Sequence, residues 1–224
     1  SWTNCVFNTR YLNTLDFLRN LPLLPCLGNH DVSLPDQSTP ANPGALARKY
    51  WPLSLYAAAD RSYYSFDYGP AHFTVLDQYA DNSSYTLESS AQYQWLASDL
   101  ANSTKSWKIV MFHEPAWTAS TLEGSDGNNT AIQTKLCPLF KNNGVKLVIQ
   151  GHASYYARVT PPDGLTYLTL GGGGAPLATP DPNAPYFAAA AKKHHFARFT
   201  IAGNALTVNV IDNAGATIES FVIN

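Results

Sequence analysis

The amino-acid sequence predicts an α/β fold, a four-layer α/β/β/α sandwich in which two packed sheets carry helices on their outer faces. Strand-like and helix-like segments alternate through the middle of the chain, and only strand-like segments follow near its end. Alternation favours a sheet covered by helices, and consecutive strands favour a second, antiparallel sheet. With 224 residues, 45% of them hydrophobic, the chain is long enough for one well-buried domain spanning residues 1–224.

The first quarter of the chain predicts a helix, a strand and a long loop. Leucines at helical spacing predict a helix over Asn13–Asn20, and Leu23–Leu27 predicts a short buried strand that ends at Gly28. The stretch Ser33–Pro52 is rich in Pro, Ser, Asn and Ala, which is typical of a loop over a site, with one helical turn or two at Ala45–Trp51.

The middle of the chain predicts a hairpin and then alternating helices and strands. Two aromatic and β-branched runs separated by a Gly-Pro pair predict the hairpin. Apolar residues at roughly four-residue spacing predict the helices. The predicted elements are strands at Ser62–Tyr68 and Ala71–Asp77, a helix at Thr86–Asn102, a strand at Lys108–Phe112, a loop at Thr118–Asn129, a helix at Ala131–Lys141, and strands at Val145–Gln150 and Leu165–Leu170.

The last 30 residues predict an antiparallel meander. Its three strands are Phe196–Ile201, Leu206–Ile211 and Thr217–Ile223, divided by turns that contain Gly and Asn.

Composition excludes several classes of partner and of compartment. Charged residues make up 13% of the chain and the formal net charge is -2, so we expect no nucleic-acid partner. No apolar run approaches the roughly 20 residues that span a bilayer, so we expect no membrane span. Low Lys, one Met and abundant Asn, Ser, Thr and Tyr are typical of a secreted or extracellular protein. Cys5, Cys26 and Cys137 lack metal-type spacing and are expected to be buried thiols, with at most one disulfide.

Three predicted strands end in polar loops that contain His. Ligands of open α/β sheets bind where strands end, and a Gly before His or Asn lets the chain turn sharply there. His imidazoles and Asn carbonyls are competent ligands for Zn, Fe or Mn. A shared metal or catalytic site and three unrelated surface residues both remain open from the pattern alone. The loops are Gly28-Asn29-His30-Asp31, Phe112-His113-Glu114-Pro115 and Gly151-His152-Ala153-Ser154.

The order of these loops resembles the third, fourth and fifth blocks of the calcineurin-like metallophosphoesterases, close to the purple acid phosphatase branch. The stretches Tyr64–Gly69, Gln94–Leu96 and Gly171–Pro176 are similar to that family too. The resemblance implies the four-layer sandwich and hydrolysis of phosphoric esters at a pair of transition-metal ions.

Carried over to this chain, the resemblance implies that Asn29, His113 and His152 bind the second metal of the pair. His30 would be the acid that protonates the leaving oxygen. Asp31 would orient His30, with a turn-capping carboxylate as the alternative role.

Residues that follow or flank these blocks have competing interpretations. Tyr156 and Arg158 are candidates for substrate binding at the opening of the site, with a packed aromatic and a surface Arg as the alternative. We expect His72 to be structural, and His194 and His195 to form a surface pair because neighbouring strand residues face opposite sides.

The family's first and second blocks, which supply the first metal's ligands and the bridging carboxylate, should precede Gly28. Residues 1–27 contain one carboxylate, Asp16, inside the predicted helix, and Ser154 stands where the family has a second His. The sequence therefore predicts one metal or none, and a domain incomplete at its N-terminus. Either a partner segment supplies the missing N-terminal strands, or this lineage has lost the first site.

Two functions are consistent with the family ligands that are present and those that are absent. The first is a metal-dependent phosphoric ester hydrolase, incomplete or degenerate, that acts on a phosphoester small molecule or a phosphoprotein. The alternative is a non-catalytic exported module that keeps the scaffold for binding or assembly.

Overall fold

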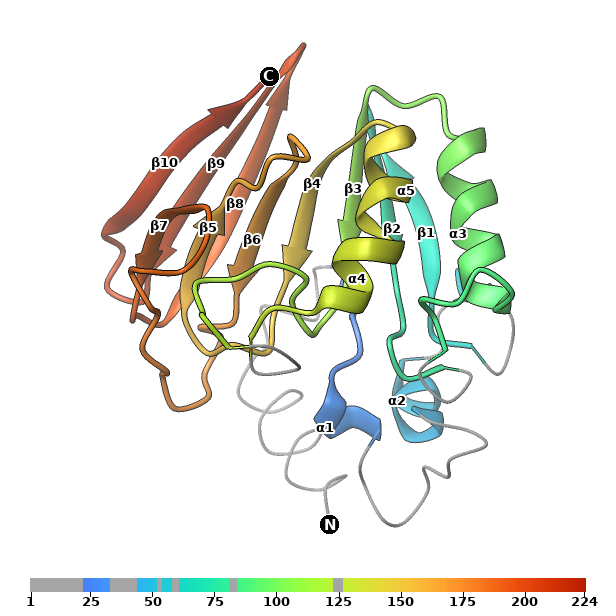
Figure 1. Cartoon of the computed structure of the whole chain (residues 1–224), viewed down its shortest axis with the longest axis horizontal. Coiled ribbons are helices and arrows are strands. Elements are labelled where there is room, and N and C mark those ends of the chain that lie inside the picture. Colours follow the sequence, from blue (N-terminus) through green and yellow to red (C-terminus); the bar gives the residue numbers. More distant parts are fainter. Residues whose placement is uncertain (1–21, 33–43, 52–53, 58–60, 81–83, 123–126) are drawn as a thin grey trace.

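The computed structural model describes residues 22–32, 44–51, 54–57, 61–80, 84–122 and 127–224, and in this part of the chain two sheets pack face to face (Figure 1). The larger sheet has seven strands in the order β1-β2-β3-β4-β6-β5-β7. Its strands are β1 (Tyr64–Tyr68), β2 (Ala71–Val75), β3 (Trp107–Met111), β4 (Val145–Gln150), β5 (Tyr156–Val159), β6 (Thr166–Leu170) and β7 (Phe187–Ala191). Strands β2, β3, β4 and β6 are parallel, so their carboxyl ends meet at one edge.

The smaller sheet is the antiparallel meander that the sequence predicts. It contains β8 (His195–Ala202), β9 (Ala205–Asp212) and β10 (Thr217–Ile223), in the order β10-β9-β8. Side chains of β9 alternate between buried and half-buried, as expected for a sheet with one face against the core.

Helices cover the other face of the large sheet (Figure 1). They are α3 (Ala91–Asn102), α4 (Thr130–Lys135) and α5 (Cys137–Asn142). Ser90 begins α3 by accepting a hydrogen bond from the Tyr93 amide, and Asn129 begins α4 in the same way through the Ile132 amide. Two short helices, α1 (Asn29–Val32) and α2 (Ala45–Tyr50), lie beyond the lower end of the sheet in this view.

The central strands are buried on both faces, which explains their continuous apolar runs. Val110 and Val148 pack in one core with the helices, whereas Ile109 and Leu147, one residue earlier on each strand, pack in a second core between the two sheets. These two cores hold the strand ends in fixed positions.

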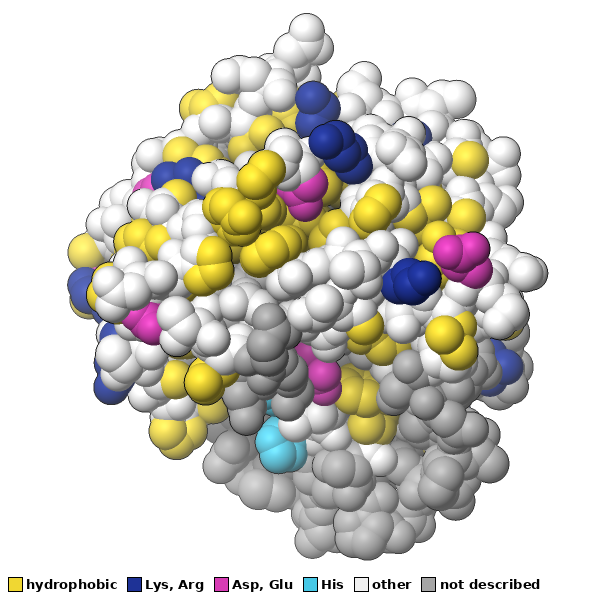
Figure 2. Space-filling view, viewed as in Figure 1, with side chains coloured by type: hydrophobic (Ala, Val, Ile, Leu, Met, Phe, Trp, Pro, Cys, Tyr) yellow, Lys and Arg dark blue, Asp and Glu magenta, His cyan; other side chains and the backbone are white. Residues whose placement is uncertain are grey.

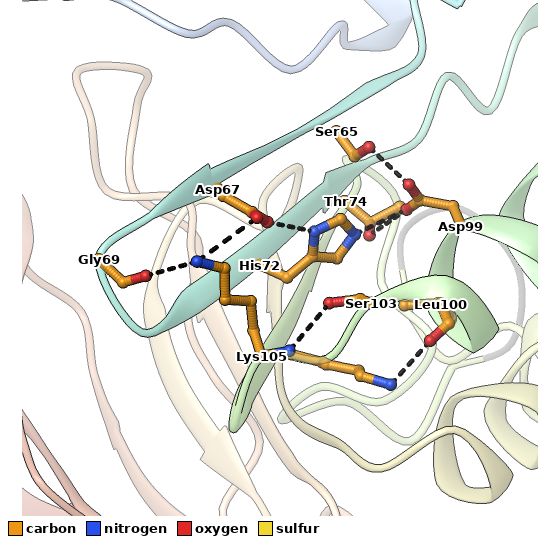
Figure 3. A network of polar contacts seen from close by, with 10 residues as sticks. Ser65, Asp67, Gly69, His72, Thr74, Asp99, Leu100, Ser103 and Lys105 are labelled. Carbon is orange, nitrogen blue, oxygen red and sulfur yellow. Dashed lines mark hydrogen bonds and ion pairs between the residues drawn. The ribbon is translucent and has the colours of Figure 1, made fainter.

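His72 connects the outer hairpin to α3 through a polar network (Figure 3). Its Nδ1 lies 2.8 Å from an Asp67 carboxylate oxygen and its Nε2 lies 2.9 Å from Asp99 on α3. Asp99 also accepts hydrogen bonds from the hydroxyls of Ser65 and Thr74. The expectation that His72 is structural is therefore confirmed.

Several sequence-based boundaries need correction. Leu23–Leu27 is described but pairs with no strand, because Pro22, just before this short segment, and Pro25, in its middle, have no backbone N–H to donate. The helix expected over Ala131–Lys141 is two helices, since Pro138 interrupts the backbone hydrogen bonding near the start of α5.

Two strands of the large sheet, β5 and β7, were not expected from the sequence. Strand β7 is mostly alanine, which has a low strand propensity, and it pairs only with β5. The helix expected over Asn13–Asn20 lies outside the described residues, and the described part places no helix on the outer face of β8–β10 (Figure 1). None of the described helices reaches the length and apolarity that crossing a bilayer requires.

Candidate metal centre

Three side chains from distant parts of the chain meet at the carboxyl ends of the parallel strands. His113 lies just beyond β3, His152 just beyond β4, and Asn29 at the start of α1. His113 Nε2 is 3.0 Å from Asn29 Oδ1 and 3.0 Å from His152 Nδ1. The two imidazole rings are nearly perpendicular, with an interplanar angle of 87°. The structure thus brings together all three residues that the resemblance assigns to one metal.

The donor atoms fit a transition-metal ion in both chemistry and spacing. Two ligands that each lie about 2.1 Å from a metal are about 3.0–3.4 Å apart at tetrahedral or octahedral angles. The separations around His113 Nε2 agree with that range. Two imidazoles and one amide oxygen suit Zn, Fe or Mn.

The electrostatic surroundings keep His113 neutral. Burial, together with the neighbouring His152 and His30, lowers the pKa of His113 to about 4. A histidine must be neutral to bind a metal, so this environment favours the ligand form.

Backbone geometry explains why these loops contain Gly. A Cβ atom on Gly28 would lie 2.8 Å from His113 Cε1, closer than real side chains approach. On the fifth-block loop, His152 itself adopts φ 59°, a conformation that L-residues rarely occupy. A Cβ atom on Gly171 would collide with the Ala153 carbonyl oxygen at 1.9 Å. The site therefore depends on close backbone approach and on a strained histidine.

Two buried glutamines hold the loops and were missed by sequence reasoning. The Gln78 side-chain oxygen accepts hydrogen bonds from the amides of His113 and Glu114, and its nitrogen donates to the Glu114 carbonyl. The Gln150 oxygen accepts from the Ala116 amide, and its nitrogen donates to the Trp117 carbonyl. Each Gln stands at or near the end of an apolar strand. A single polar residue at such a position was the sequence signal that could have identified these supporting side chains.

His30 and Asp31, on α1, lie beside the three candidate ligands. His30 is exposed, and it is close enough for its charge to lower the pKa of His113. The Asp31 carboxylate accepts a hydrogen bond of 2.9 Å from the Gly28 amide, which is the turn-capping role. Burial raises the pKa of Asp31. No hydrogen bond between His30 and Asp31 occurs in the described part of the chain.

Tyr156 and Arg158 do not reach this site. Tyr156 is completely buried between the two sheets, where its hydroxyl donates to Glu219. Arg158 Nη2 lies 2.5 Å from Glu219, and its guanidinium stacks on the Phe221 ring. We therefore correct the substrate-binding assignment, because both side chains are bound to the second sheet. The core between the sheets also buries His195, which was expected at the surface.

No other candidate cluster competes with this one in the described ranges. They contain no group of three or more His, Cys, Asp or Glu side chains placed to hold a metal ion. Ser154 follows the candidate ligand His152 by two residues, and Asp16 lies outside the described residues. Cys26 and Cys137 are free thiols, and burial raises the pKa of each to about 12.

The sequence is similar to plant phosphatases. Purple acid phosphatase 15 of Arabidopsis thaliana is 27% identical over 197 residues, which cover 74% of this chain and 36% of that protein. Purple acid phosphatase 22 of the same plant is 30% identical over 164 residues, covering 68% of this chain and 36% of that protein. The chain thus spans about a third of the length of the curated relatives it matches.

The fold is similar to a solved plant enzyme. Purple acid phosphatase PPD1 from yellow lupin (Lupinus luteus) seeds superposes with a TM-score of 0.73 at 19% sequence identity, covering 88% of this chain and 39% of that one. This likeness confirms the expected metallophosphoesterase type of α/β fold. The family model described as calcineurin-like phosphoesterase matches residues 3–155, well over half of the chain. The chain therefore belongs to the calcineurin-like phosphoesterase family.

Proposed function

We propose that this chain is a metal-dependent phosphoric ester hydrolase whose own residues hold one metal ion. The observation that carries the proposal is the convergence of Asn29, His113 and His152, with both contacts to His113 Nε2 at 3.0 Å. Family membership supports the reaction class. The metal would be Zn, Fe or Mn, as the two imidazoles and the amide oxygen indicate.

The residues of the chain divide into ligands, an acid and supports. A cation at the three ligands would act as a Lewis acid toward a phosphoryl oxygen. His30, exposed beside them, would give its proton to the leaving oxygen. Gln78 and Gln150 fix the loops beforehand, so that the ligands need little rearrangement. The substrate would be a phosphoester small molecule or a phosphoprotein.

This chain alone is expected to supply one metal site. The described residues supply no second cluster of metal ligands, and the relatives are about twice as long as this chain. We expect weak single-metal hydrolysis by this chain. A two-metal site would need ligands from a partner segment, which would also supply further N-terminal strands.

Metal content and turnover of His113→Ala test the proposal. We expect about one metal ion per chain by elemental mass spectrometry in the parent protein and background levels in the variant. His194→Ala serves as a matched control, because the His194 ring contacts the Gly172 carbonyl and none of the three candidate ligands. Release of phosphate from a simple aryl phosphate should disappear together with the metal. A variant that keeps both its metal and its turnover contradicts the proposal.

A second candidate is a non-catalytic module that keeps the scaffold, secreted in keeping with its composition. Two observations favour this module. Ser154 supplies a hydroxyl where the family has an imidazole ligand, and the cluster contains only two imidazoles among the described residues. Intact mass and elemental analysis of one sample separate the two candidates. Bound metal without turnover on any phosphomonoester, from a chain of the expected mass, supports the module.

A further inference from the structure

A cavity of about 550 Å³ opens beside His152, and its walls come from three loops. These are residues 119–122 after β3, residues 152–155 after β4, and residues 178–181 before β7. Hydrogen bonds join them: the Asp181 amide donates to the Ala119 carbonyl at 2.9 Å, and the Ala178 amide donates to the Ser154 carbonyl at 3.0 Å. The cavity is therefore a connected structure that shares one wall with the candidate metal centre.

The polar lining of the cavity carries hydroxyls and a single negative charge. Hydroxyls come from Ser120, Thr121, Ser154 and Thr179. Asp181 is the one carboxylate among the described lining residues, which include no Lys or Arg. One Lys contacts the lining from outside: Lys192 Nζ donates to the Thr179 hydroxyl at 3.0 Å. Figure 2 shows that the face seen there carries its Lys and Arg side chains singly or in small groups, without an extended basic surface among the described residues.

Asp181 is held in position and in its charged form. The Thr121 hydroxyl donates to Asp181 Oδ2 at 3.0 Å, and the Asn183 amide donates to Asp181 Oδ1 at 2.8 Å. The Asn183 amide, and then the Thr121 hydroxyl, lower the pKa of Asp181. Each carboxylate oxygen keeps further acceptor capacity for a ligand.

This charge distribution decides which part of a phosphoester fits the cavity. A phosphate dianion beside Asp181 would meet like charge. The described lining has no Lys or Arg of its own, and Lys192, outside it, already donates to Thr179, so the phosphoryl group belongs at the His152 end. The alcohol part would then extend among the hydroxyls toward Asp181. An ammonium group on that alcohol gains attraction to Asp181, and a further anionic group is repelled.

We propose that the cavity between residues 119–122, 152–155 and 178–181 binds the alcohol part of a phosphomonoester, and that Asp181 selects an amino alcohol over an anionic alcohol. The inference rests on the proposed function for the position of the phosphoryl group. In the reaction, a water oxygen forms a bond to phosphorus, the ester P–O bond breaks, and the alcohol oxygen leaves with a proton. Binding of the free amino alcohol needs no metal.

Binding of three matched two-carbon alcohols to the chelator-treated full chain tests the cavity without any turnover. The probes are ethanolamine (cationic), ethylene glycol (neutral) and glycolate (anionic), followed by NMR shift titration, which detects millimolar affinity. We expect ethanolamine to bind most tightly and Asp181→Asn to weaken it about three- to tenfold, the effect of one partly exposed charge. Glu88→Gln removes an exposed carboxylate outside the cavity and serves as the matched control. Equal binding of all three probes, or unchanged binding by Asp181→Asn, overturns the proposal.

Turnover of the corresponding phosphomonoesters separates this proposal from the proposed function. With metal-loaded protein, kcat/KM should fall in the order phosphoethanolamine, 2-hydroxyethyl phosphate, phosphoglycolate, and Asp181→Asn should compress that order. Equal turnover of all three, with or without Asp181, overturns the cavity proposal and keeps the hydrolase. Selective ethanolamine binding without turnover of any ester supports the cavity and removes the hydrolase.

Discussion

Two histidines on neighbouring parallel strands show opposite ways of using the same side chain. His72 lies near the start of β2, and both of its ring nitrogens face carboxylates, Asp67 and Asp99 (Figure 3). His113 follows the end of β3, and its Nε2 faces a second imidazole and an amide oxygen. The partners of His72 complete its hydrogen bonding. The partners of His113 place further lone pairs next to its Nε2, where a cation could bind.

The difference teaches how a structural histidine is told from a ligand. A ring whose nitrogens are both paired with carboxylates has nothing left to offer a metal, and it joins the elements that carry its partners. A ring that is surrounded by other lone-pair donors and kept neutral by burial can bind a cation. It contributes little to holding its loop. At the candidate metal centre, Gln78 holds the loop instead.

Replacing His72 should cause the largest loss of stability. His72→Phe keeps a ring of similar size but leaves the carboxylate of Asp99, which is mostly buried, with only its two hydroxyl donors. We expect the free energy of unfolding to fall by about 2–4 kcal/mol. Urea denaturation measures it, and His30→Ala, at an exposed position, should change it by less than about 0.5 kcal/mol. Similar losses in the two variants would contradict the structural role of His72.

Adding a methyl group at Gly28 should damage the metal centre with a smaller effect on the fold. The new Cβ would lie 2.8 Å from His113 Cε1, so the imidazole must shift from its present position beside Asn29 and His152. We expect Gly28→Ala to weaken metal affinity about 10- to 100-fold by isothermal titration. Gly173→Ala is the matched control, because no atom lies within 4 Å of its Cβ position. Equal affinities in the two variants would show that Gly28 does not position His113.

The neutral state of His113 should appear as a pH dependence of stability in the chelator-treated chain. Burial, with His152 and His30 beside it, lowers the folded-state pKa of His113 to about 4, and an unfolded His titrates at about 6.5. The unfolded chain therefore takes up the proton first, and the free energy of unfolding falls between about pH 6.5 and pH 4 and then levels off. The free energy of unfolding, measured by denaturation at each pH, should fall across this window in the parent and stay nearly constant in His113→Asn. Parallel curves would mean that His113 titrates alike in both states.

The smallest expected effect tests whether His72 itself holds its network together. Lys105 Nζ donates to the Gly69 carbonyl at 3.0 Å and lies 3.5 Å from Asp67, but Lys105 and Asp67 are both partly exposed. We expect Lys105→Met to lower the free energy of unfolding by less than about 1 kcal/mol by the same denaturation assay. A loss as large as that of His72→Phe would mean that Lys105, and not His72, makes the main contribution of this network to stability.

Local patterns in the sequence were enough to predict elements that have one clear periodicity. The hairpin of β1 and β2, the strand β4 over Val145–Gln150 and the three-strand meander all follow alternating or continuous apolar runs bounded by turns. The candidate ligands His113 and His152 could be named because each follows such a strand and stands in a family block, whereas Asn29 was named from its family block alone.

Contacts between distant segments were beyond that reasoning. Strand β7 exists because β5 offers it an edge, although its alanines favour no strand. Tyr156 and Arg158 were expected at the substrate, and Glu219, 61 residues beyond Arg158, holds both between the sheets. Nothing within a few residues of Tyr156 indicates that partner.

By itself, the sequence determined the class of the fold, the succession of its main strands along the chain and the family, because these depend on short-range periodicity and on residues within single loops. Only the tertiary structure decided which polar side chains point into the site and which bind another sheet. It also decided that Gln78 and Gln150 hold the ligand loops and that Asp181 faces a cavity beside His152. The physical reason is that burial and hydrogen-bond pairing are properties of surfaces brought together by folding, and the two partners of such a pair are far apart along the chain.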